Sequence, residues 1–341
     1  MYKSLTIILL ALLALTSCNK KVDGVPDAAN AVYYWRTTLQ FDSTERQFLT
    51  DHKIGKMYVR FFDVVLDESE DCEPNATLQF TDSIPDGVEV IPTVFITENC
   101  LKQNIDDLPS LIVKRVLQMC ETNDIAGVKE MQIDCDWTKN SQNAYFNMLS
   151  KVRQLLEVND MRLSVTIRLH QLNMTPPPAD YGVLMMYNTG DPTNRQCENP
   201  ILGLKEVEPY LKYVDNYELP LCVAYPNFGW KLLFQGETFK SILYDADLND
   251  TTLYRRMTAN NYMAISSRGI ATGPGYEAVD THINPGDVVL VKEVPFALIK
   301  RVHDLLGEHR SNINNQVIFY DLKTENIKRY KPNEYETIYH P

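Results

Sequence analysis

The sequence lacks most of the short motifs that indicate a cofactor or a nucleophile. It has no Cys-x-x-Cys pair, which argues against a cysteine zinc site. It has no glycine-rich phosphate loop, no Gly-x-Ser-x-Gly elbow and no His-Glu-x-x-His helix, which argues against nucleotide-binding, esterase and zinc-protease functions. Lysine and arginine form no cluster and the net charge is -12, so no nucleic-acid partner is expected. No metal or other cofactor is predicted.

Long apolar runs are also missing, except at the N-terminus. There, residues 5–15 are apolar, which is shorter than the ~20 residues of a typical transmembrane helix. The segment ends in Leu-Thr-Ser-Cys at residues 15–18 and resembles a bacterial lipoprotein signal. The resemblance implies that residues 1–17 are removed, that Cys18 carries acyl chains such as palmitate, and that residues 18–31 form a tether. The alternative is an uncleaved anchor.

The expected location follows from this signal. A lipidated Cys18 attaches a folded domain to a membrane without spanning it. The chain is therefore predicted to be a membrane-anchored lipoprotein of the bacterial cell envelope, facing the periplasm or the cell surface, with the outer membrane favoured.

Six further cysteines follow the predicted signal. An exported protein can oxidise some of them. Cys72 lies after the second expected strand and Cys100 lies just past the third, so this pair is the predicted disulfide. Cys120, Cys135 and Cys222 lie among apolar residues and are predicted to be buried thiols.

Runs rich in β-branched and aromatic residues alternate with segments of helical periodicity along the chain. Over a length of about 320 residues this alternation predicts an α/β fold, a (β/α)8 TIM barrel spanning residues 32–341. The seventh and eighth runs are far apart, which predicts an insertion at about residues 230–308 between strands 7 and 8. The expected strands are residues 32–39, 56–66, 89–97, 128–137, 162–170, 182–187, 219–225 and 317–322, and helices are expected at 108–121 and 143–158.

The fourth expected strand carries two acids on one face. Because side chains alternate along a strand, Asp134 and Asp136 share a side with Gln132 and Thr138. Unpaired acids are too costly for an apolar barrel interior. Asp134, nearer the middle of the strand, is expected to be a hydrogen-bonded brace, whereas Asp136, nearer the carboxyl end, is expected to face an active-site mouth.

On the second expected strand, Arg60 and Asp63 lie three residues apart. Regular alternation places them on opposite faces of the strand. Both can point into the barrel only if the strand contains a bulge.

The sixth expected strand ends in Met-Met-Tyr-Asn at residues 185–188. Together with Asp134 and Asp136, this motif resembles the family 18 glycoside hydrolases, which include chitinases, endo-N-acetylglucosaminidases and non-catalytic chitinase-like lectins. In that family the fourth strand ends in alternating acids followed by a catalytic glutamate. Thr138 stands at the glutamate position here. The resemblance implies a cleft for a glycan that contains N-acetylhexosamine.

The family's chemistry shows what the missing glutamate would have supplied. The substrate's own N-acetyl group attacks the anomeric carbon, while one acid protonates the leaving oxygen, a carboxylate orients the acetamido group and a hydroxyl holds its carbonyl. By resemblance, Asp136 and Tyr187 fill the last two roles. The Thr138 hydroxyl is too weak an acid for the first. A proton shared between Asp134 and Asp136 is one replacement; Glu98, beyond the third strand and also a candidate for substrate binding, is the other.

Further residues are expected to bind substrate around these acids. Arg168 and His170 share a face of the fifth expected strand, where Arg168 is expected to form a salt bridge that keeps the fourth-strand acids ionised. Trp35 and Trp230 lie near strand ends, where an indole can stack on a sugar ring. Asn188 ends the sixth-strand motif and is assigned to the same group.

Two functional hypotheses result. The leading one is an envelope lipoprotein that recognises an N-acetylated glycan, with hydrolysis left open because the expected catalytic glutamate is absent. The alternative is a catalytically inactive barrel that binds a glycan or a protein in the cell envelope.

Overall fold

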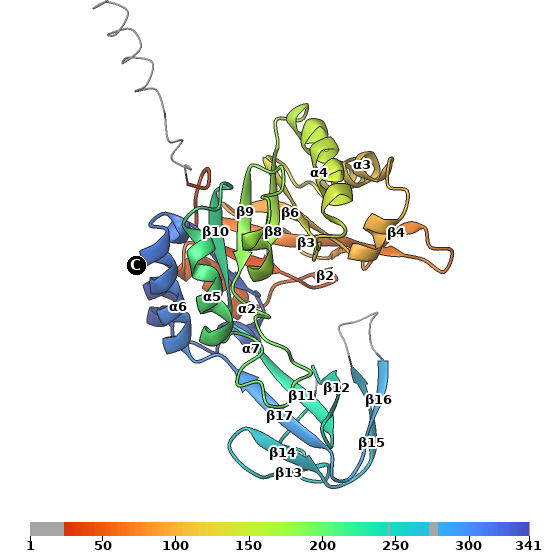
Figure 1. Ribbon diagram of the computed structural model, residues 1–341, viewed down its shortest axis with the longest axis vertical. Coiled ribbons are helices and arrows are strands. Elements are labelled where there is room, and N and C mark those ends of the chain that lie inside the picture. Colours follow the sequence, from red (N-terminus) through yellow and green to blue (C-terminus); the bar gives the residue numbers. More distant parts are fainter. Residues whose placement is uncertain (1–23, 245, 273–278, 341) are drawn as a thin grey trace, which may run out of the picture.

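A computed structural model describes residues 24–244, 246–272 and 279–340. The predicted signal segment, Cys18 and the first part of the tether lie outside these residues. Eight parallel strands form a closed barrel, because β1 pairs with both β18 and β3 (Figure 1). The predicted (β/α)8 barrel is therefore confirmed. The barrel strands are β1 (Ala31–Tyr34), β3 (Lys56–Leu66), β6 (Glu89–Ile96), β7 (Glu130–Asp134), β8 (Arg162–Ile167), β9 (Tyr181–Met185), β10 (Leu221–Pro226) and β18 (Val317–Tyr320).

Each of the eight expected strands overlaps one of these. The reason is that strands of a parallel barrel are buried on both faces and so appear in the sequence as nearly continuous apolar runs. In β3 the first nine of eleven residues are buried, and all residues of β7, β9 and β10 are.

Helices cover the outside of the barrel (Figure 1). In α4 the buried residues recur at helical spacing on the side that faces the strands, and α3 and α5 show the same pattern. The helices are α2 (Ser43–Asp51), α3 (Leu108–Thr122), α4 (Gln142–Glu157), α5 (Leu204–Val214), α6 (Phe296–His309), α7 (Thr324–Ile327) and α8 (Pro332–Tyr339), with 3-10 helices η1 (Glu98–Lys102), η2 (Leu169–Asn173) and η4 (Ile313–Asn315).

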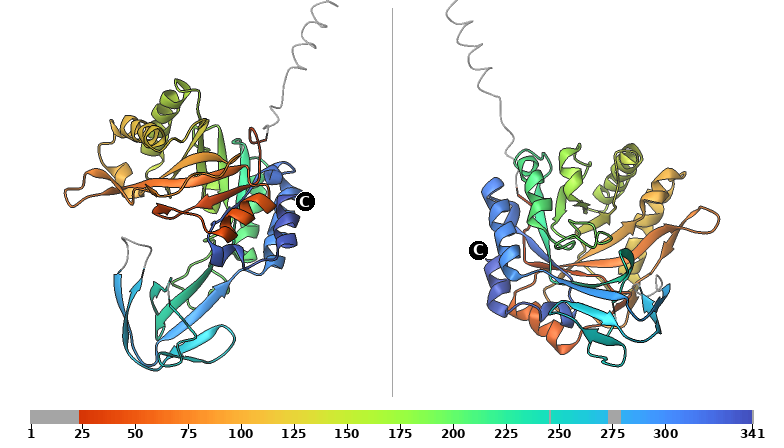
Figure 2. Two further views of the ribbon diagram at one scale, coloured as in Figure 1. Left: turned by 180° about the vertical axis from the view of Figure 1, so that it is seen from behind. Right: turned by 60° about the horizontal axis from the view of Figure 1, so that its bottom comes forward.

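Between β10 and α6 the chain forms a separate antiparallel sheet of five strands in the order β12-β11-β17-β14-β13, and a hairpin of β15 and β16. This insertion extends from the end of the barrel at which β10 leaves it (Figures 1 and 2). α6, which follows, packs beside α5 as a barrel helix. The strands are β11 (Gly229–Gln235), β12 (Thr238–Ile242), β13 (Tyr254–Arg256), β14 (Asn261–Ala264), β15 (Arg268–Thr272), β16 (Val279–Ile283) and β17 (Val288–Glu293); short strands elsewhere are β2 (Thr38–Leu39), β4 (Cys72–Asn75) and β5 (Gln79–Phe80).

A buried polar network fills the amino-terminal half of the barrel. Glu130 Oε1 accepts hydrogen bonds from the Ser164 hydroxyl at 2.6 Å and the Tyr181 hydroxyl at 2.5 Å. The Tyr181 hydroxyl is also 2.6 Å from that of Tyr58, and the Lys56 ammonium lies 4.0 Å from Glu130 Oε2. Burial raises the pKa of Glu130, although Lys56 and the two hydroxyls oppose the shift. This half of the barrel is a packed polar core.

A bulge in β3 brings Arg60 and Asp63 together. The register with β6 shifts between Arg60 and Phe62, which leaves Phe61 as the extra residue. Arg60 Nε then donates to Asp63 Oδ1 at 2.7 Å, and both side chains are buried. Regular alternation would place these two residues on opposite faces of the strand. The bulge that the sequence requires for them to share a face is present.

The described cysteines are free thiols, so the predicted disulfide between Cys72 and Cys100 is wrong. Cys72 Sγ faces the carbonyl oxygen of Cys100 at 3.9 Å, while Cys100 Sγ contacts the carbonyl oxygen of Val64 at 3.5 Å. Burial raises the pKa of the Cys72 thiol to about 12 and the neighbouring Cys100 thiol adds to the shift, so the two thiols lie close together without a disulfide bond between them. The prediction of buried thiols at positions 120, 135 and 222 is confirmed.

Candidate functional site

Arg168 joins the two acids of the fourth barrel strand at the carboxyl end of the barrel, which is called the mouth below. β7 ends at Asp134, and Asp136 follows outside the strand. Arg168 follows β8; its Nη2 lies 3.2 Å from Asp134 Oδ1, and its Nε is ion-paired with Asp136 Oδ1. Asp134 is buried and also accepts a 2.5 Å hydrogen bond from the Thr166 hydroxyl, whereas the Asp136 side chain is 56% exposed.

Burial and neighbouring charges shift the pKa values of Asp134 and Arg168. Burial raises the pKa of Asp134, and Asp136 adds to the shift, although Arg168 and Thr166 oppose it. Burial lowers the pKa of Arg168, but the two carboxylates outweigh burial and the net shift is upward. Arg168 is thus a permanent cation. Asp134, whose pKa is raised, is only 4% exposed, which leaves it out of reach of a glycosidic oxygen.

Glu98 lies beside the residue that occupies the glutamate position. Glu98 Oε1 accepts hydrogen bonds from the Thr138 hydroxyl at 2.6 Å, the Thr138 backbone N–H at 3.2 Å and the Ser141 hydroxyl at 2.7 Å. The hydrogen bonds from Thr138 and Ser141 hold the pKa of Glu98 below its ordinary value. Glu98 is therefore an ionised carboxylate that fixes the start of α4, and its protonated form is disfavoured.

Five aromatic side chains form a continuous row across the mouth: Trp35, Tyr320, Tyr187, Phe228 and Trp230. Ring centroids are 5.9 Å apart from Trp35 to Tyr320, 5.0 Å from Tyr320 to Tyr187, 6.0 Å from Tyr187 to Phe228 and 5.7 Å from Phe228 to Trp230. These separations are typical of aromatic packing. All but Tyr187 are partly exposed. This aromatic row connects the first barrel strand with the insertion.

The sequence missed two members of the aromatic row, Tyr320 and Phe228. The sequence contains a signal for both: Tyr320 lies in the eighth expected strand, near its end, and Phe228 follows the seventh, so each is expected near the mouth of a parallel barrel. The Tyr187 ring contacts both of these rings, which also contact each other with centroids 5.7 Å apart, and Tyr187 lies close to Arg168. Burial raises the pKa of Tyr187 well above its ordinary value, so its hydroxyl stays protonated and can donate a hydrogen bond.

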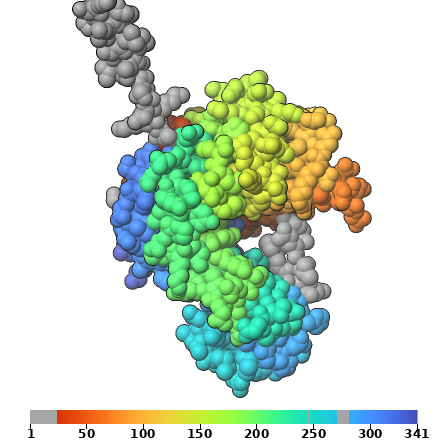
Figure 3. Space-filling view, in the orientation of Figure 1, coloured from red at the N-terminus to blue at the C-terminus, as the bar shows by residue number. Residues whose placement is uncertain are grey.

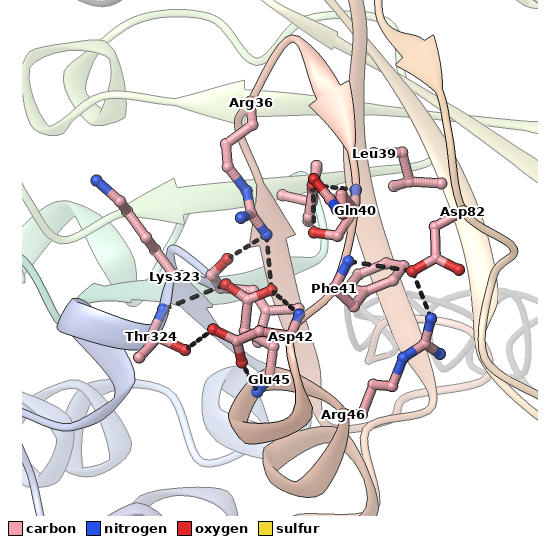
Figure 4. Close-up of polar contacts among 12 residues, drawn as sticks. Arg36, Leu39, Gln40, Phe41, Asp42, Glu45, Arg46, Asp82, Lys323 and Thr324 are labelled. Carbon is pink, nitrogen blue, oxygen red and sulfur yellow. Dashed lines mark hydrogen bonds and ion pairs between the residues drawn. The ribbon is translucent and has the colours of Figure 1, made fainter.

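The loop that carries Trp35 is held by a polar network (Figure 4). Arg36, the next residue, donates to the carboxylate of Glu45 at 2.9 Å and to the carbonyl oxygen of Leu322 at 3.3 Å. Glu45 is buried and accepts from the backbone N–H of Thr324 at 3.2 Å. The loop after β1 and the segment after β18 are therefore fixed to one another, which positions Trp35 beside Tyr320.

Two predicted binding residues, His170 and Asn188, lie outside the barrel strands and are exposed. His170 was expected on a strand face beside Arg168, but β8 ends at Ile167 and His170 lies exposed in η2. The chain turns there because Gln171 hydrogen-bonds both the Arg168 backbone N–H and the Trp137 carbonyl oxygen. Within the described residues His170 makes no hydrogen bond to the other candidates. Asn188 is exposed in a left-handed turn with φ of 54°, a conformation that asparagine tolerates.

Among residues 24–244, 246–272 and 279–340, no group of three or more His, Cys, Asp or Glu side chains is arranged to hold a metal ion.

The geometry can be compared with known proteins. No family model and no curated protein matches the sequence. Solved structures match over 92% of the chain. The chitinase of Chromobacterium violaceum is 13% identical, with a TM-score of 0.56 and 99% of its own chain covered. The Group IV chitinase of Ostrinia furnacalis is 9% identical, with a TM-score of 0.53 and 100% covered. The spore cortex-lytic enzyme SleL of Bacillus megaterium is 12% identical, with a TM-score of 0.51 and 74% covered.

These likenesses define the class: the chain has the (β/α)8 fold of the chitinases, as the resemblance to family 18 glycoside hydrolases implies. At such low identity the comparison concerns the fold alone.

Proposed function

We propose that this chain binds an N-acetylated glycan at the barrel mouth and does not cleave it. The observation that carries the proposal is the aromatic row, which runs beside the ion-paired carboxylates of Asp134 and Asp136. Aromatic faces pack against apolar faces of a ligand, while carboxylates, Arg168 and the Tyr187 hydroxyl offer hydrogen bonds to hydroxyl and acetamido groups.

The absence of cleavage is inferred from the acids at the mouth. Hydrolysis needs a carboxyl group that is protonated near neutral pH and reaches the leaving oxygen. Thr138 has no carboxyl, and hydrogen bonds keep Glu98 ionised. Asp136 is exposed but ion-paired with Arg168, and Asp134 is buried. No carboxyl group in this set combines protonation with access.

The ligand class is supported by the structural neighbours. An Ostrinia furnacalis Group II chitinase domain, with a TM-score of 0.50, was solved in complex with an oligosaccharide of N-acetylglucosamine, and the Group IV enzyme was solved with allosamidin. A chain with the same barrel and an aromatic mouth is suited to ligands of this kind.

We also infer that the protein displays this mouth away from a membrane. The signal-like residues 1–17 and Cys18 support a lipid anchor on the cell envelope. Residues 24–30 lie at the amino end of the barrel, where Asp27 pairs with Arg162 at 2.9 Å at the start of β8. The mouth is at the other end. No helix in the described part of the chain is long and apolar enough to cross a membrane.

The test is calorimetry of the chain from residue 19 onward with oligosaccharides of N-acetylglucosamine and with N-glycans, followed by mass spectrometry of the same mixtures. We expect binding without products. Trp35→Ala is expected to weaken binding about tenfold, or about 1.4 kcal/mol, because it removes one end of the aromatic row. Tyr213→Ala, a half-buried aromatic on α5, is the matched control and should leave affinity unchanged.

Each other outcome has a definite meaning. Products that disappear in Asp136→Asn would show a hydrolase with a rearranged acid. Failure of every glycan to bind would contradict the proposal and leave a protein-binding envelope role.

A further inference from the structure

A pocket of about 390 Å³ lies outside the mouth, between the segment 195–199 and strands β14 and β17 of the insertion. The segment belongs to the long connection from β9 to α5. In Figure 3 this connection, in green, lies against the insertion, in cyan. None of the candidate residues described above lines the pocket.

The two walls of the pocket are fixed to one another. Arg195 Nη1 donates to the carbonyl oxygen of Gly236 at 2.7 Å, in the turn between β11 and β12. From the opposite wall, Lys292 Nζ donates to the carbonyl oxygens of Cys197 and Glu198, both at 2.9 Å. These bonds join the loop to β17 and to the turn that follows β11. The pocket is therefore formed by the folded chain and needs no ligand to assemble it.

The charged groups that line the pocket already have partners. Arg195 pairs with Glu237 at 2.6 Å, and Glu293 pairs with Arg329 at 2.6 Å. Lys292 is occupied by the two carbonyl oxygens, and the Glu198 carboxylate lies 3.6 Å from Lys205. A phosphate, a carboxylate or an amine would have to compete with these pairs. The charges thus favour an uncharged ligand.

Three neutral amides remain for such a ligand. Within the described residues, the side chains of Gln196, Asn260 and Asn261 form no hydrogen bond, and all three line the pocket. Each amide offers two donors and an acceptor oxygen. This combination suits a ligand rich in hydroxyl and acetamido groups.

The pocket lies on the same face of the insertion sheet as the end of the aromatic row. Trp230 on β11 is paired with Lys292 on β17, and Leu290 on β17 is paired with Asn261 on β14. Directly opposed residues of antiparallel strands, and residues two apart on one strand, share a face. Trp230 and Asn261 are two strands apart across the sheet and two residues apart along it, which gives a separation of about 12 Å.

We propose that a glycan bound at the mouth extends past Trp230 and that its next sugars bind in this pocket through Gln196, Asn260 and Asn261. The inference rests on the proposed glycan function and adds a second, distal subsite to it. Its consequence is a dependence on chain length: a long oligosaccharide reaches both regions, whereas a short one occupies the mouth alone.

The test compares the affinities of a disaccharide and a hexasaccharide of N-acetylglucosamine for the chain from residue 19 onward and for its Asn260→Ala/Asn261→Ala variant. We expect the double substitution to weaken hexasaccharide binding about tenfold and to change disaccharide binding less than about twofold. Gln196→Ala, at an exposed loop position, should also weaken hexasaccharide binding more than disaccharide binding. It tests the subsite independently if the double variant misfolds. Asn333→Ala, at an exposed position in α8, is the control.

The outcomes distinguish the two proposals. Equal effects on both oligosaccharides, or no effect on either, would overturn the distal subsite while leaving the mouth in place. If neither oligosaccharide binds the unaltered chain, the proposed function fails and the subsite fails with it.

Discussion

Arg168 determines how the acids of the mouth can behave. It contacts both Asp134 and Asp136, and one of its nitrogens, Nη1, is buried without a partner within the described residues. A guanidinium placed between two carboxylates offsets part of their mutual repulsion. It therefore disfavours a proton shared between Asp134 and Asp136.

Replacing Arg168 should therefore destabilise the fold. Arg168→Met leaves the Asp134 carboxylate buried without its cation, and removal of one partner of a buried pair costs about 3 kcal/mol. We expect a loss of this size in the free energy of unfolding from urea denaturation. Adding Asp134→Asn should restore part of it, because the buried charge is gone. An unchanged denaturation midpoint in Arg168→Met would show that the pair contributes nothing to stability.

Glu98 predicts a dependence of stability on pH. Its pKa in the folded chain lies below the ordinary value of 4.5, so the unfolded chain binds the proton more readily. Its contribution is therefore complete above pH 4.5 and is lost as the pH falls through the lower, folded pKa. The unfolding free energy of Glu98→Gln should fall less than that of the unaltered chain between about pH 6 and pH 3.

The control for this measurement is Glu121→Gln, at an exposed position on α3. It should follow the pH profile of the unaltered chain. A Glu98→Gln profile that also follows the unaltered chain would mean that the hydrogen bonds from Thr138 and Ser141 do not hold the carboxylate ionised.

At the scale of residues, the sequence could predict which residues lie at the mouth but not all of the contacts among them. Asp134, Asp136 and Arg168 were predicted because they lie at the ends of adjacent parallel strands or within two residues beyond them, where alternation still gives a common face. The partnership of Glu98 with Thr138 could not be predicted, because it joins two segments that follow strands, where alternation no longer applies. His170 was misplaced for the same reason: the strand ends three residues before it.

At the scale of elements, β9 depends on a close approach of its neighbours. A Cβ atom at Gly182 would lie 2.7 Å from Ile167 Cγ1 on β8 and 3.1 Å from Leu221 Cδ2 on β10. A methyl group at residue 182 therefore fits only if these neighbouring side chains move. The glycine thus allows β8 and β10 to pack closely around β9, which carries Tyr187 to the mouth.

Gly182→Ala is accordingly expected to lower the free energy of unfolding by about 1 to 3 kcal/mol, the usual cost of overpacking a filled core. Thermal and urea denaturation measure the effect. Gly269→Ala in β15 is the control: its nearest neighbour would be His282 Nε2 at 3.9 Å, and stability should be nearly unchanged. Similar small effects at both positions would show that the strands around β9 yield without cost.

Barrel strands were easier to predict than the insertion for a physical reason. Strands buried on both faces are apolar along their length, and the predicted limits of 56–66 coincide with β3. The insertion sheet has one open face in several strands, and β12 and β13 contain exposed polar residues, so neither periodicity nor apolarity marks them clearly. Alternation shows that Arg60 and Asp63 can share a face only if β3 contains a bulge. It does not show that the bulge forms, so the bulge itself could not be predicted.

At the scale of the whole molecule, the two ends of the barrel have different uses. Residues 24–30 approach the amino end, where Gly24 lies beside Asn312 and Asn315 just before β18. The insertion lies at the carboxyl end (Figure 2), and the residues of the aromatic row follow the carboxyl ends of barrel strands or end them. An anchor at Cys18 would therefore hold the mouth on the far side of the barrel from the membrane.

The anchor is tested by Cys18→Ser in the full chain expressed in bacteria. Loss of the acylated cysteine should move the protein from the membrane fraction to the soluble envelope fraction and abolish labelling with palmitate. Cys197→Ser, at a partly exposed position on the loop before α5, is the control and should remain in the membrane fraction. Retention of Cys18→Ser in the membrane would instead support an uncleaved N-terminal anchor.

The orientation gives a separate prediction for the lipidated protein on vesicles. Because residues 24–30 and the mouth lie at opposite ends of the barrel, the vesicle surface should not obstruct the glycan. The hexasaccharide should then bind with the affinity measured for the soluble chain, within about twofold. Calorimetry with protein-bearing vesicles and with Cys18→Ser in solution compares the two directly. Affinity that is lost on vesicles but kept in solution would place the mouth against the membrane and contradict the orientation, even if the glycan function itself holds.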